Sequence, residues 1–532
     1  MDLILYNGIG YTMDENNPLV HAMAIVGNKI AAVGSNIEIL KLKSKNTILI
    51  NLHNNCFIPG LNDSHLHLYG TGKFLSQVNL LEIASISAVK QKVSDFLHNT
   101  DDEWILGRGW NQDYFIDEAR YINRSDLDEI STERPIVLTR ACGHVITVNS
   151  KAIKLAGVDE NTRVFEGTID LEKGIFTENA INLITHAIPN PSITKVKEIL
   201  LKAMKYANSF GITSLQTDDF TQGEALDKQT VLQAYLELQK EQLLTCRIYE
   251  QSLLPKINNL QEFIEAGYKT GIGDDFFKIG PLKLIADGSL GARTAALKKP
   301  YADDKNTMGI LIYEKDELKD IISYAHNQGM QIAVHCIGDD AMEQVLDIYE
   351  EVLKANPRDN HRHGIVHCQI MNENLHQRFA FNNIIAYIQP IFIHYDHLIV
   401  EKRVGYELAK TSYAFQSLLK NGVKIAMGTD SPIELINPFN NIYCAVTRKS
   451  LNNTPQNGWL LEESLSIQEA LFSYTVGSAY ASFEETLKRG YLADVAIIDK
   501  DIFNIPHDEI PSINVLMTIV DGRVVYERDF DE

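Results

Sequence analysis

Both ends of the chain show short apolar runs separated by tight turns. Residues 22–26 and 29–33 are apolar runs on either side of Gly27-Asn28, which is the pattern of a β-hairpin. Near the other end, residues 494–498 form one apolar run, and residues 515–520 and 523–526 flank the turn Asp521-Gly522. We therefore expect short β-strands at both ends of the chain.

The middle of the chain has a different pattern, in which short apolar runs alternate with longer amphipathic stretches. Strands that alternate with helices indicate parallel βα units. Several of the runs end in a polar residue able to do chemistry, as expected for a (β/α)8 barrel whose active site lies at the strand C-termini. The runs are residues 211–215, 282–286, 331–335, 364–367, 384–388 and 423–427.

The central region is longer than a plain barrel, which needs about 250 residues. We assign residues 59–484 to the barrel and expect an inserted α+β segment within it. The stretch at about residues 75–190 contains no chemistry-bearing strand end before residues 140–144, so we place the insertion there.

Composition narrows the function classes. The 532 residues include 70 Asp and Glu against 49 Lys and Arg, a net charge of −21. Such a surface repels phosphate backbones, so nucleic acid is not an expected partner. We find neither a signal-peptide pattern nor an apolar run of the ~20 residues that cross a bilayer. Six cysteines without a Cys-x-x-Cys pair fit a reducing cytoplasm and no membrane association.

The first candidate for chemistry is His65 with His67, in the segment Ile58-Pro-Gly-Leu-Asn-Asp-Ser-His-Leu-His. Positions i and i+2 of a strand face the same way, so the two imidazoles can share one metal ion. A bare His-x-His pair is more often a packing or surface feature. The preceding Pro-Gly-Leu-x-Asp and the later strand-end histidines favour the metal site.

Three further residues end apolar runs where a barrel would present them at its mouth. His335 and His367 are each followed by a cysteine, and we expect Cys336 and Cys368 to pack toward the helices. Asp430 lies in Met427-Gly-Thr-Asp-Ser-Pro, where a carboxylate can bind metal and accept a proton from water. Taken singly, each histidine could be a core residue and the aspartate a turn cap.

Lys283 lies inside an apolar run, in Leu282-Lys-Leu-Ile-Ala-Asp-Gly-Ser-Leu-Gly. A buried lysine is costly when charged, so it is paired, neutral or modified. An interior ion pair is one reading, and Lys278, five residues earlier, is another candidate for the functional lysine.

These motifs, in this order, resemble the amidohydrolase superfamily, and within it the amidohydrolase 3 branch that contains N-substituted formamide deformylase. The resemblance covers nearly the whole chain and includes Gly107-Arg-Gly-Trp, Gly174-Ile-Phe-Thr-Glu and Gly490-Tyr-Leu-Ala-Asp. One departure is Cys142-Gly143-His144, where relatives often have Asp-Gly-His, so an acidic group near the substrate pocket is absent here.

The resemblance implies an α/β fold: a distorted TIM (β/α)8 barrel with a small β-sandwich domain built from residues 1–58 and 485–532. It implies that His65 and His67 bind one metal ion and that His335 and His367 bind a second. Asp430 would contact the first ion and move the proton. Lys283 would be carboxylated and would bridge both ions, which removes the difficulty of a buried cation.

The expected activity is hydrolysis of a non-peptide C–N bond, in an amide or an N-formyl or N-acyl group of a small molecule. Two divalent ions, with zinc favoured, would activate a bridging hydroxide that attacks the carbonyl carbon, and Asp430 would pass its proton to the leaving nitrogen. Esters and lactones are open to the same attack. Candidate substrate-binding residues, each with packing or capping as its alternative, are Trp110, His144, Glu178, Asp287 and Arg293.

Two other functions stay open. The first is deamination of a heterocycle by a mononuclear site, although such relatives usually have a Glu soon after a strand-end histidine, where this chain has His335-Cys-Ile-Gly-Asp-Asp. The second is a non-catalytic, ligand-binding regulatory protein on the same barrel. Beyond a small-molecule substrate, a homodimer is the one partner expectation, by analogy with other large acidic barrels.

Overall fold

The computed structural model describes residues 1–220, 227–484 and 490–528. The chain forms two compact units. Unit 1 comprises Met1–Gly70, Leu200–Thr221 and Val231–Glu532, and unit 2 comprises Thr71–Ile199 and Gln222–Thr230. Unit 2 contains all of the segment, at about residues 75–190, in which we expect an insertion. The expected domain boundary at residue 485 lies outside the described residues.

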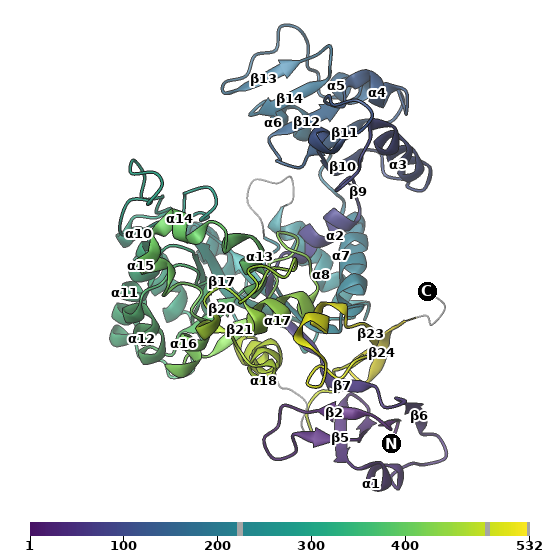
Figure 1. The fold of residues 1–532 in the computed structure, drawn as a ribbon, viewed down its shortest axis with the longest axis vertical. Helices are drawn as coiled ribbons and strands as arrows, with labels where there is room; N and C mark the ends of the chain where they lie inside the picture. Colours follow the sequence, from purple (N-terminus) through teal and green to yellow (C-terminus); the bar gives the residue numbers. More distant parts are fainter. Residues whose placement is uncertain (221–226, 485–489, 529–532) are drawn as a thin grey trace. The chain divides into compact units, whose positions relative to one another are not determined.

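An eight-stranded parallel sheet, curved into a nearly closed barrel, forms the centre of unit 1 (Figure 1). The strands follow one another around the barrel in sequence order, and the predicted distorted TIM-barrel fold is confirmed. Nearly every strand residue is buried, which explains the continuous apolar runs in the sequence. The strands are β8 (Leu61–Leu66), β15 (Ile212–Thr217), β16 (Arg247–Leu253), β17 (Phe277–Ile285), β18 (Ile332–Cys336), β19 (Gly364–His367), β20 (Ile385–Ile388) and β21 (Ile425–Met427).

Helices cover the outside of the barrel. In α11 (Asp339–Ala355), Met342, Val345, Leu346 and Tyr349 are buried at the spacing of one helical face. Other helices of the barrel are α9 (Ile257–Glu265), α10 (Lys315–Asn327), α12 (Glu373–Phe381), α13 (Ile393–Asp396), α16 (Phe415–Lys420), α17 (Pro438–Thr447) and α18 (Ile467–Phe472).

A small β domain in unit 1 contains strands from both ends of the chain, as predicted. One sheet has the order β5-β4-β1-β6, and the other has the order β24-β23-β22-β7-β2-β3. A single core cluster, which includes Leu5, Met23, Phe57, Val495 and Ile519, joins the two sheets. The strands are β1 (Leu3–Tyr6), β2 (Ile9–Tyr11), β3 (Leu19–Val20), β4 (Ala22–Val26), β5 (Lys29–Gly34), β6 (Ile48–Asn51), β7 (Cys56–Pro59), β22 (Val495–Ile498), β23 (Val515–Val520) and β24 (Arg523–Glu527).

Unit 2 is an α+β structure with its own hydrophobic core. Its six-stranded sheet has the order β13-β14-β12-β11-β10-β9, with helices α3 (Ile86–His98), α4 (Arg124–Asp128), α5 (Ser150–Leu155) and α6 (Ile181–Thr185). The strands are β9 (Val78–Asn79), β10 (Ile105–Trp110), β11 (Ile136–Arg140), β12 (Val145–Val148), β13 (Gly167–Asp170) and β14 (Ile175–Glu178).

Among the described residues, no helix has the length and apolar character needed to cross a membrane.

A buried ion pair connects the barrel to the β domain. The Arg247 guanidinium, on β16, donates to both carboxylate oxygens of Asp494 at 2.6 and 3.0 Å, and to Asp521 at 3.0 Å. The Arg247 side chain is only 2% exposed. Removing one member of such a pair leaves uncompensated charge in a site shielded from water.

Replacing Arg247 with Met is therefore expected to lower the free energy of unfolding by about 3–5 kcal/mol, measured by urea denaturation. The matched control is Lys319→Met, which breaks an ion pair with Glu351 whose side chains are 44% and 47% exposed. That variant should unfold like the wild type, since exposed ion pairs contribute little. Equal urea midpoints for all three proteins would contradict the prediction.

Three buried histidines form a hydrogen-bonded chain between α10 and β19. His326 Nδ1 lies 2.9 Å from His363 Nε2, and His326 Nε2 lies 2.7 Å from the Asn356 carbonyl oxygen. The Ile332 N–H donates to His363 Nδ1, and the His363 N–H donates to His361 Nδ1. Since each of these rings has a nitrogen that accepts a hydrogen bond, the three rings are held in neutral form.

Burial lowers the pKa of His363 well below its usual value, lowers that of His361 to about 4 and also lowers that of His326. The unfolded chain binds protons at these rings below about pH 6.5, whereas the folded chain excludes them. Their contribution to stability is therefore complete above about pH 6.5 and is lost as the pH falls toward 4, with a slope of up to about 1.4 kcal/mol per pH unit for each ring. Unfolding free energy measured from about pH 7.5 to 5 should fall less steeply for His363→Gln than for the wild type. Parallel profiles would show that His363 does not contribute.

Candidate metal centre

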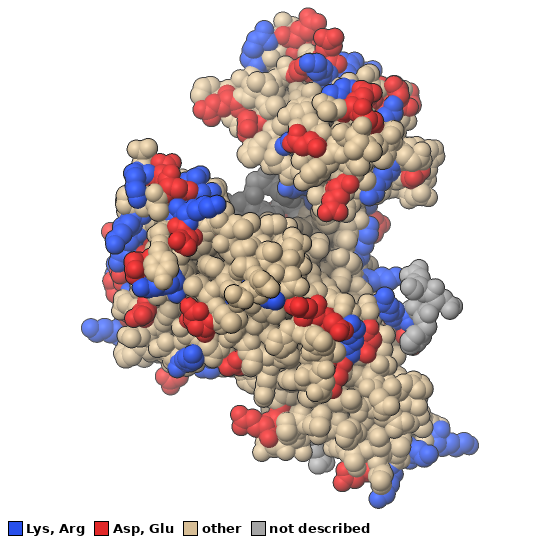
Figure 2. Space-filling view, in the orientation of Figure 1, with Lys and Arg blue, Asp and Glu red and all other residues tan. Residues whose placement is uncertain are grey.

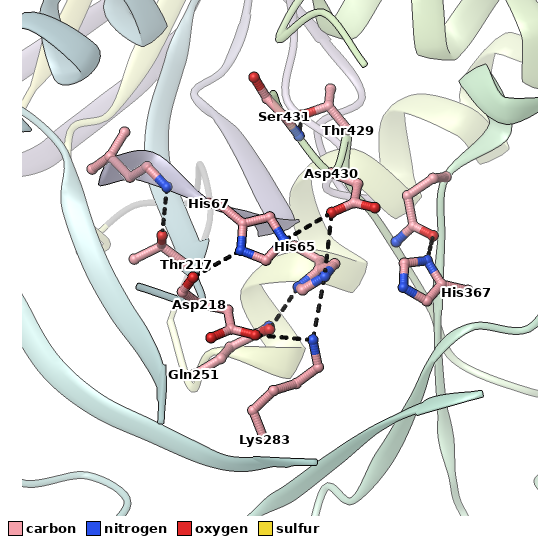
Figure 3. A network of polar contacts seen from close by, with 12 residues as sticks. His65, His67, Thr217, Asp218, Gln251, Lys283, His367, Thr429, Asp430 and Ser431 are labelled. Carbon is pink, nitrogen blue, oxygen red and sulfur yellow. Dashed lines mark hydrogen bonds and ion pairs between the residues drawn. The ribbon is translucent and has the colours of Figure 1, made fainter. Parts of the chain in front are cut away.

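Three side chains that can bind a metal ion converge at the mouth of the barrel (Figure 3). His65 belongs to β8, His67 follows it directly, and Asp430 follows β21. His67 Nε2 lies 3.2 Å from Asp430 Oδ1, and His65 Nε2 lies 3.5 Å from the same oxygen. All three offer one ligand atom within 4.8 Å of the others, which is the geometry of a shared ion.

Hydrogen bonds at the opposite ring nitrogens fix how these histidines are protonated. His65 Nδ1 lies 2.7 Å from Gln251 Oε1, and His67 Nδ1 lies 2.8 Å from the backbone oxygen of Asp218. The Gln251 amide is itself oriented, because its Nε2 donates to the Ser64 carbonyl at 2.9 Å. Both partners of the rings can only accept, so each Nδ1 carries a proton, and the Nε2 atom of each ring faces Asp430.

This donor set fits a divalent cation. Two imidazole lone pairs and a carboxylate oxygen directed at one point repel each other unless a positive charge lies between them. Asp430 Oδ1 is buried and has no hydrogen-bond partner among the described residues. Imidazole nitrogen with carboxylate oxygen is a ligand set that suits zinc and neighbouring divalent metals.

A second pair of histidines adjoins the first. The rings of His335 and His367 lie 4.4 Å apart, and the His367 ring lies 5.5 Å from that of His65. His367 Nδ1 lies 2.9 Å from Gln389 Oε1, and His335 Nε2 lies 3.2 Å from the Gly288 carbonyl oxygen. The same argument from acceptor-only partners leaves one nitrogen of each neutral ring able to bind a metal.

The electrostatics of the site keep most of these rings neutral. Burial, with the positive charge of Lys283, lowers the pKa of His65 well below its usual value and that of His335 to about 3. Burial also lowers the pKa of His367 well below its usual value. For His67 the lowering by burial is outweighed by the Asp430 carboxylate, so its pKa rises to about 9. A metal ion beside Asp430 would take the place of the His67 proton.

Lys283 lies beside His65, and its side chain is 2% exposed. Its Nζ is 3.4 Å from His65 Nε2 and 3.2 Å from Asp218 Oδ2. Our reading of the sequence did not include Asp218. The available signal was its position directly after β15, which matches that of His67 and Asp430 after their strands.

Asp287 is buried and bound to the backbone of neighbouring loops. Its side chain is fully buried, and its oxygens accept hydrogen bonds from the backbone N–H groups of Ala296, Ile337 and Gly338 at 2.7–3.0 Å. Burial raises its pKa to about 7. These contacts fit the capping alternative, because the carboxylate holds the loop after β17 against the end of β18, near His335. Substrate binding by Asp287 stays a prediction.

Trp110 likewise lies in a core, that of unit 2. Its ring is fully buried among apolar side chains, and its Nε1 donates to the Leu138 carbonyl at 3.1 Å. Because both the ring and its polar nitrogen already have partners, the structure fits the packing alternative for Trp110, and its contact with substrate stays a prediction.

Of the other three predicted pocket residues, His144 and Glu178 are exposed and Arg293 is half-buried. Arg293 donates to Asp303 at 3.0 and 3.1 Å. In unit 2, His144 Nδ1 lies 2.9 Å from Glu178 Oε2, with the two side chains 69% and 57% exposed. Substrate binding by these residues stays a prediction.

Comparison with known proteins agrees with this geometry. The sequence model of the amidohydrolase family matches residues 49–526. The chain belongs to this family. It is 32% identical to YtcJ of Bacillus subtilis (strain 168), a protein named as an amidohydrolase, over 99% of this chain and 100% of that protein. It is 23% identical to N-substituted formamide deformylase of Arthrobacter pascens over 99% of this chain and 98% of that enzyme.

Among solved structures, an uncharacterized metal-dependent hydrolase from Pyrococcus furiosus superimposes with a TM-score of 0.79 and 29% sequence identity. The superposition covers 94% of this chain and 100% of the archaeal one. The amidohydrolase described here is thus a metal-dependent hydrolase, with His65, His67 and Asp430 as its candidate metal site.

Gln251 offers a test of the first site that leaves the ligands intact. Gln251→Leu removes the acceptor that holds the His65 Nδ1 proton, so zinc affinity, measured by competition with a coloured chelator, should fall about 10–100-fold. Gln251→Glu keeps an acceptor at the same place and should bind zinc at least as tightly as the leucine variant. Equal affinity of the wild type and Gln251→Leu would show that this hydrogen bond does not tune the ligand.

Proposed function

We propose that this amidohydrolase hydrolyses a non-peptide C–N bond of a small molecule, an amide or an N-formyl or N-acyl amine, at a centre of two divalent ions, with zinc as the expected metal. The observation that carries the proposal is the adjacency of two histidine pairs, with one buried lysine beside His65. His65 and His367 are the neighbouring members of the two pairs, with their rings 5.5 Å apart.

His65, His67 and Asp430 would hold one ion, and His335 and His367 would hold the other. Lys283 would be carboxylated and would contribute an oxygen to both. In that modification the neutral amine adds to CO2, an N–C bond forms and one proton is released, so that a cation becomes an anionic ligand. Divalent ions, when bound, lower the pKa of water and polarise a carbonyl oxygen.

Asp430 is the residue that we assign to proton transfer. Its carboxylate lies beside both His65 and His67, and in the proposed reaction it accepts a proton from the attacking water. It then delivers that proton to the nitrogen that leaves when the C–N bond breaks. Because the carboxylate is only 8% exposed, bulk water has little access to the proton that it holds.

The side chains around the mouth favour an apolar substrate. The Phe392 ring lies 6.0 Å from that of His367. The loops after β20 and β21 expose Tyr395, Leu398, Ile433 and Leu435, each 57–67% exposed. Figure 2 shows few charged side chains over α13 and α17, the helices that follow these strands. We infer that the acyl or amine part of the substrate is apolar.

Lys283→Ala tests the two-ion centre. The wild type, purified without chelator, should contain about two divalent ions per chain by elemental analysis, and the variant should contain markedly less. The control is Lys278→Ala, at a half-buried position of the same strand, β17, which should retain the wild-type metal content. In the wild type but not in Lys283→Ala, ¹³C-labelled bicarbonate should give the NMR signal of a carbamate.

A substrate screen separates the candidate reactions. Release of amine from N-formyl or N-acyl amines with apolar substituents would support the proposal. Loss of this activity in Lys283→Ala, with its retention in Lys278→Ala, would assign the activity to the site that contains Lys283. The three-ligand group formed by His65, His67 and Asp430 would also suit a mononuclear deaminase. One ion in both the wild type and Lys283→Ala, with ammonia released from heterocyclic amines, would replace the proposal with that alternative.

A further inference from the structure

The first metal site lies where the barrel closes, between the first and the last strand of its sheet. Strands β8 and β21 are the two ends of the eight-stranded order. Two backbone hydrogen bonds join them: the Asp430 N–H donates to the His65 carbonyl, and the His67 N–H donates to the Ser431 carbonyl, both at 2.8 Å. Since His65 and His67 lie on one side and Asp430 on the other, the spacing of the ligands depends on how this junction is held.

The Asp63 carboxylate binds both sides of the junction. On the β21 side it accepts hydrogen bonds from the Thr429 N–H, at 3.1 Å to each oxygen, and from Thr429 Oγ1 at 2.7 Å. On the β8 side it accepts one from the His65 N–H at 3.2 Å. The Tyr474 hydroxyl donates to it at 3.1 Å. All of these partners donate, and the carboxylate, which is fully buried, only accepts.

The backbone at Gly428 allows the two sides to approach closely. A Cβ atom at this position would lie 2.6 Å from Asp63 Oδ1 and 2.6 Å from the His65 backbone nitrogen. Such a contact would push the end of β21 away from β8. The sequence thus has glycine at position 428 and a carboxylate that accepts several hydrogen bonds at position 63, where the ligands from the two strands must meet.

We propose that Asp63 is a positioning residue of the first metal site: by tying Thr429 to the backbone of His65, its carboxylate sets the distance between Asp430 and the two histidines. This inference deepens the proposed function and rests on its first metal site. Asp63 does not itself face the ion position, because its two oxygens are directed at the backbone and hydroxyl donors described above.

The test is Asp63→Asn, measured by zinc affinity in competition with a coloured chelator. The amide keeps one acceptor oxygen but turns an NH2 group toward N–H and O–H donors, so the junction must open. We expect zinc to bind about 10–100-fold more weakly. The visible spectrum of the cobalt-substituted protein should change, and the backbone N–H groups of His67 and Asp430 should exchange faster with deuterium.

Arg247→Met controls for a merely structural role, because it destabilises the same unit far from the ligands in sequence while leaving the junction intact. It should keep wild-type zinc affinity and the wild-type cobalt spectrum. If Asp63→Asn fails to fold, Thr429→Val removes the Oγ1–H donor to Asp63, together with the acceptor of the Ser431 N–H at 3.4 Å, and should weaken zinc binding by several-fold.

The outcomes separate the positioning role of Asp63 from the existence of the metal centre. Weaker zinc binding in the junction variants, with normal binding in Arg247→Met, supports a positioning role for Asp63. Wild-type affinity and spectrum in folded Asp63→Asn, whatever its stability, would overturn it. A wild-type protein that binds no divalent metal would instead overturn the proposed metal centre.

Discussion

The histidines at the mouth of the barrel are held so that their lone pairs face inward. Gln251, Gln389 and two backbone carbonyls each occupy one ring nitrogen, and none of these groups can donate through the atom concerned. Burial keeps most of the rings neutral, so their other nitrogens remain able to bind a metal. These hydrogen bonds orient the rings. A buried lone pair costs free energy unless a cation or a hydrogen-bond donor interacts with it.

The scaffold meets that requirement by joining elements that are distant in sequence. The barrel brings the C-terminal ends of β8, β17, β18, β19 and β21 to one rim, and Asp63 and Asp287 then fasten loops at that rim through backbone N–H groups. At the opposite end, Arg247 connects β16 to the β domain built from both chain ends. Rigid attachment of this kind is what a metal site needs, because ligand distances tolerate only small errors.

The features that the sequence did not reveal, strand β16 and the buried contacts of Trp110 and Asp287, have a common cause. Strand β16 was not predicted because Arg247, Glu250 and Gln251 interrupt its apolar pattern. All three are buried, and Arg247 and Gln251 have hydrogen-bond partners there. Trp110 and Asp287 were candidate substrate-binding residues, with packing or capping as the alternative. The structure gives each of them partners within a core or a loop. In each case a polar atom was satisfied by a residue far along the chain.

The sequence alone determined the barrel, the strands at the chain ends and the residues able to bind metal. Those features follow from local periodicity and from side chains at the ends of apolar runs, which neighbouring residues specify. Only the tertiary structure decided that Asp218 contacts Lys283, that Gln251 and Gln389 orient the ring nitrogens, and that Asp63 ties β8 to β21. Hydrogen-bond partners depend on distances and directions across the fold, and these arise only once strands separated by up to several hundred residues lie side by side.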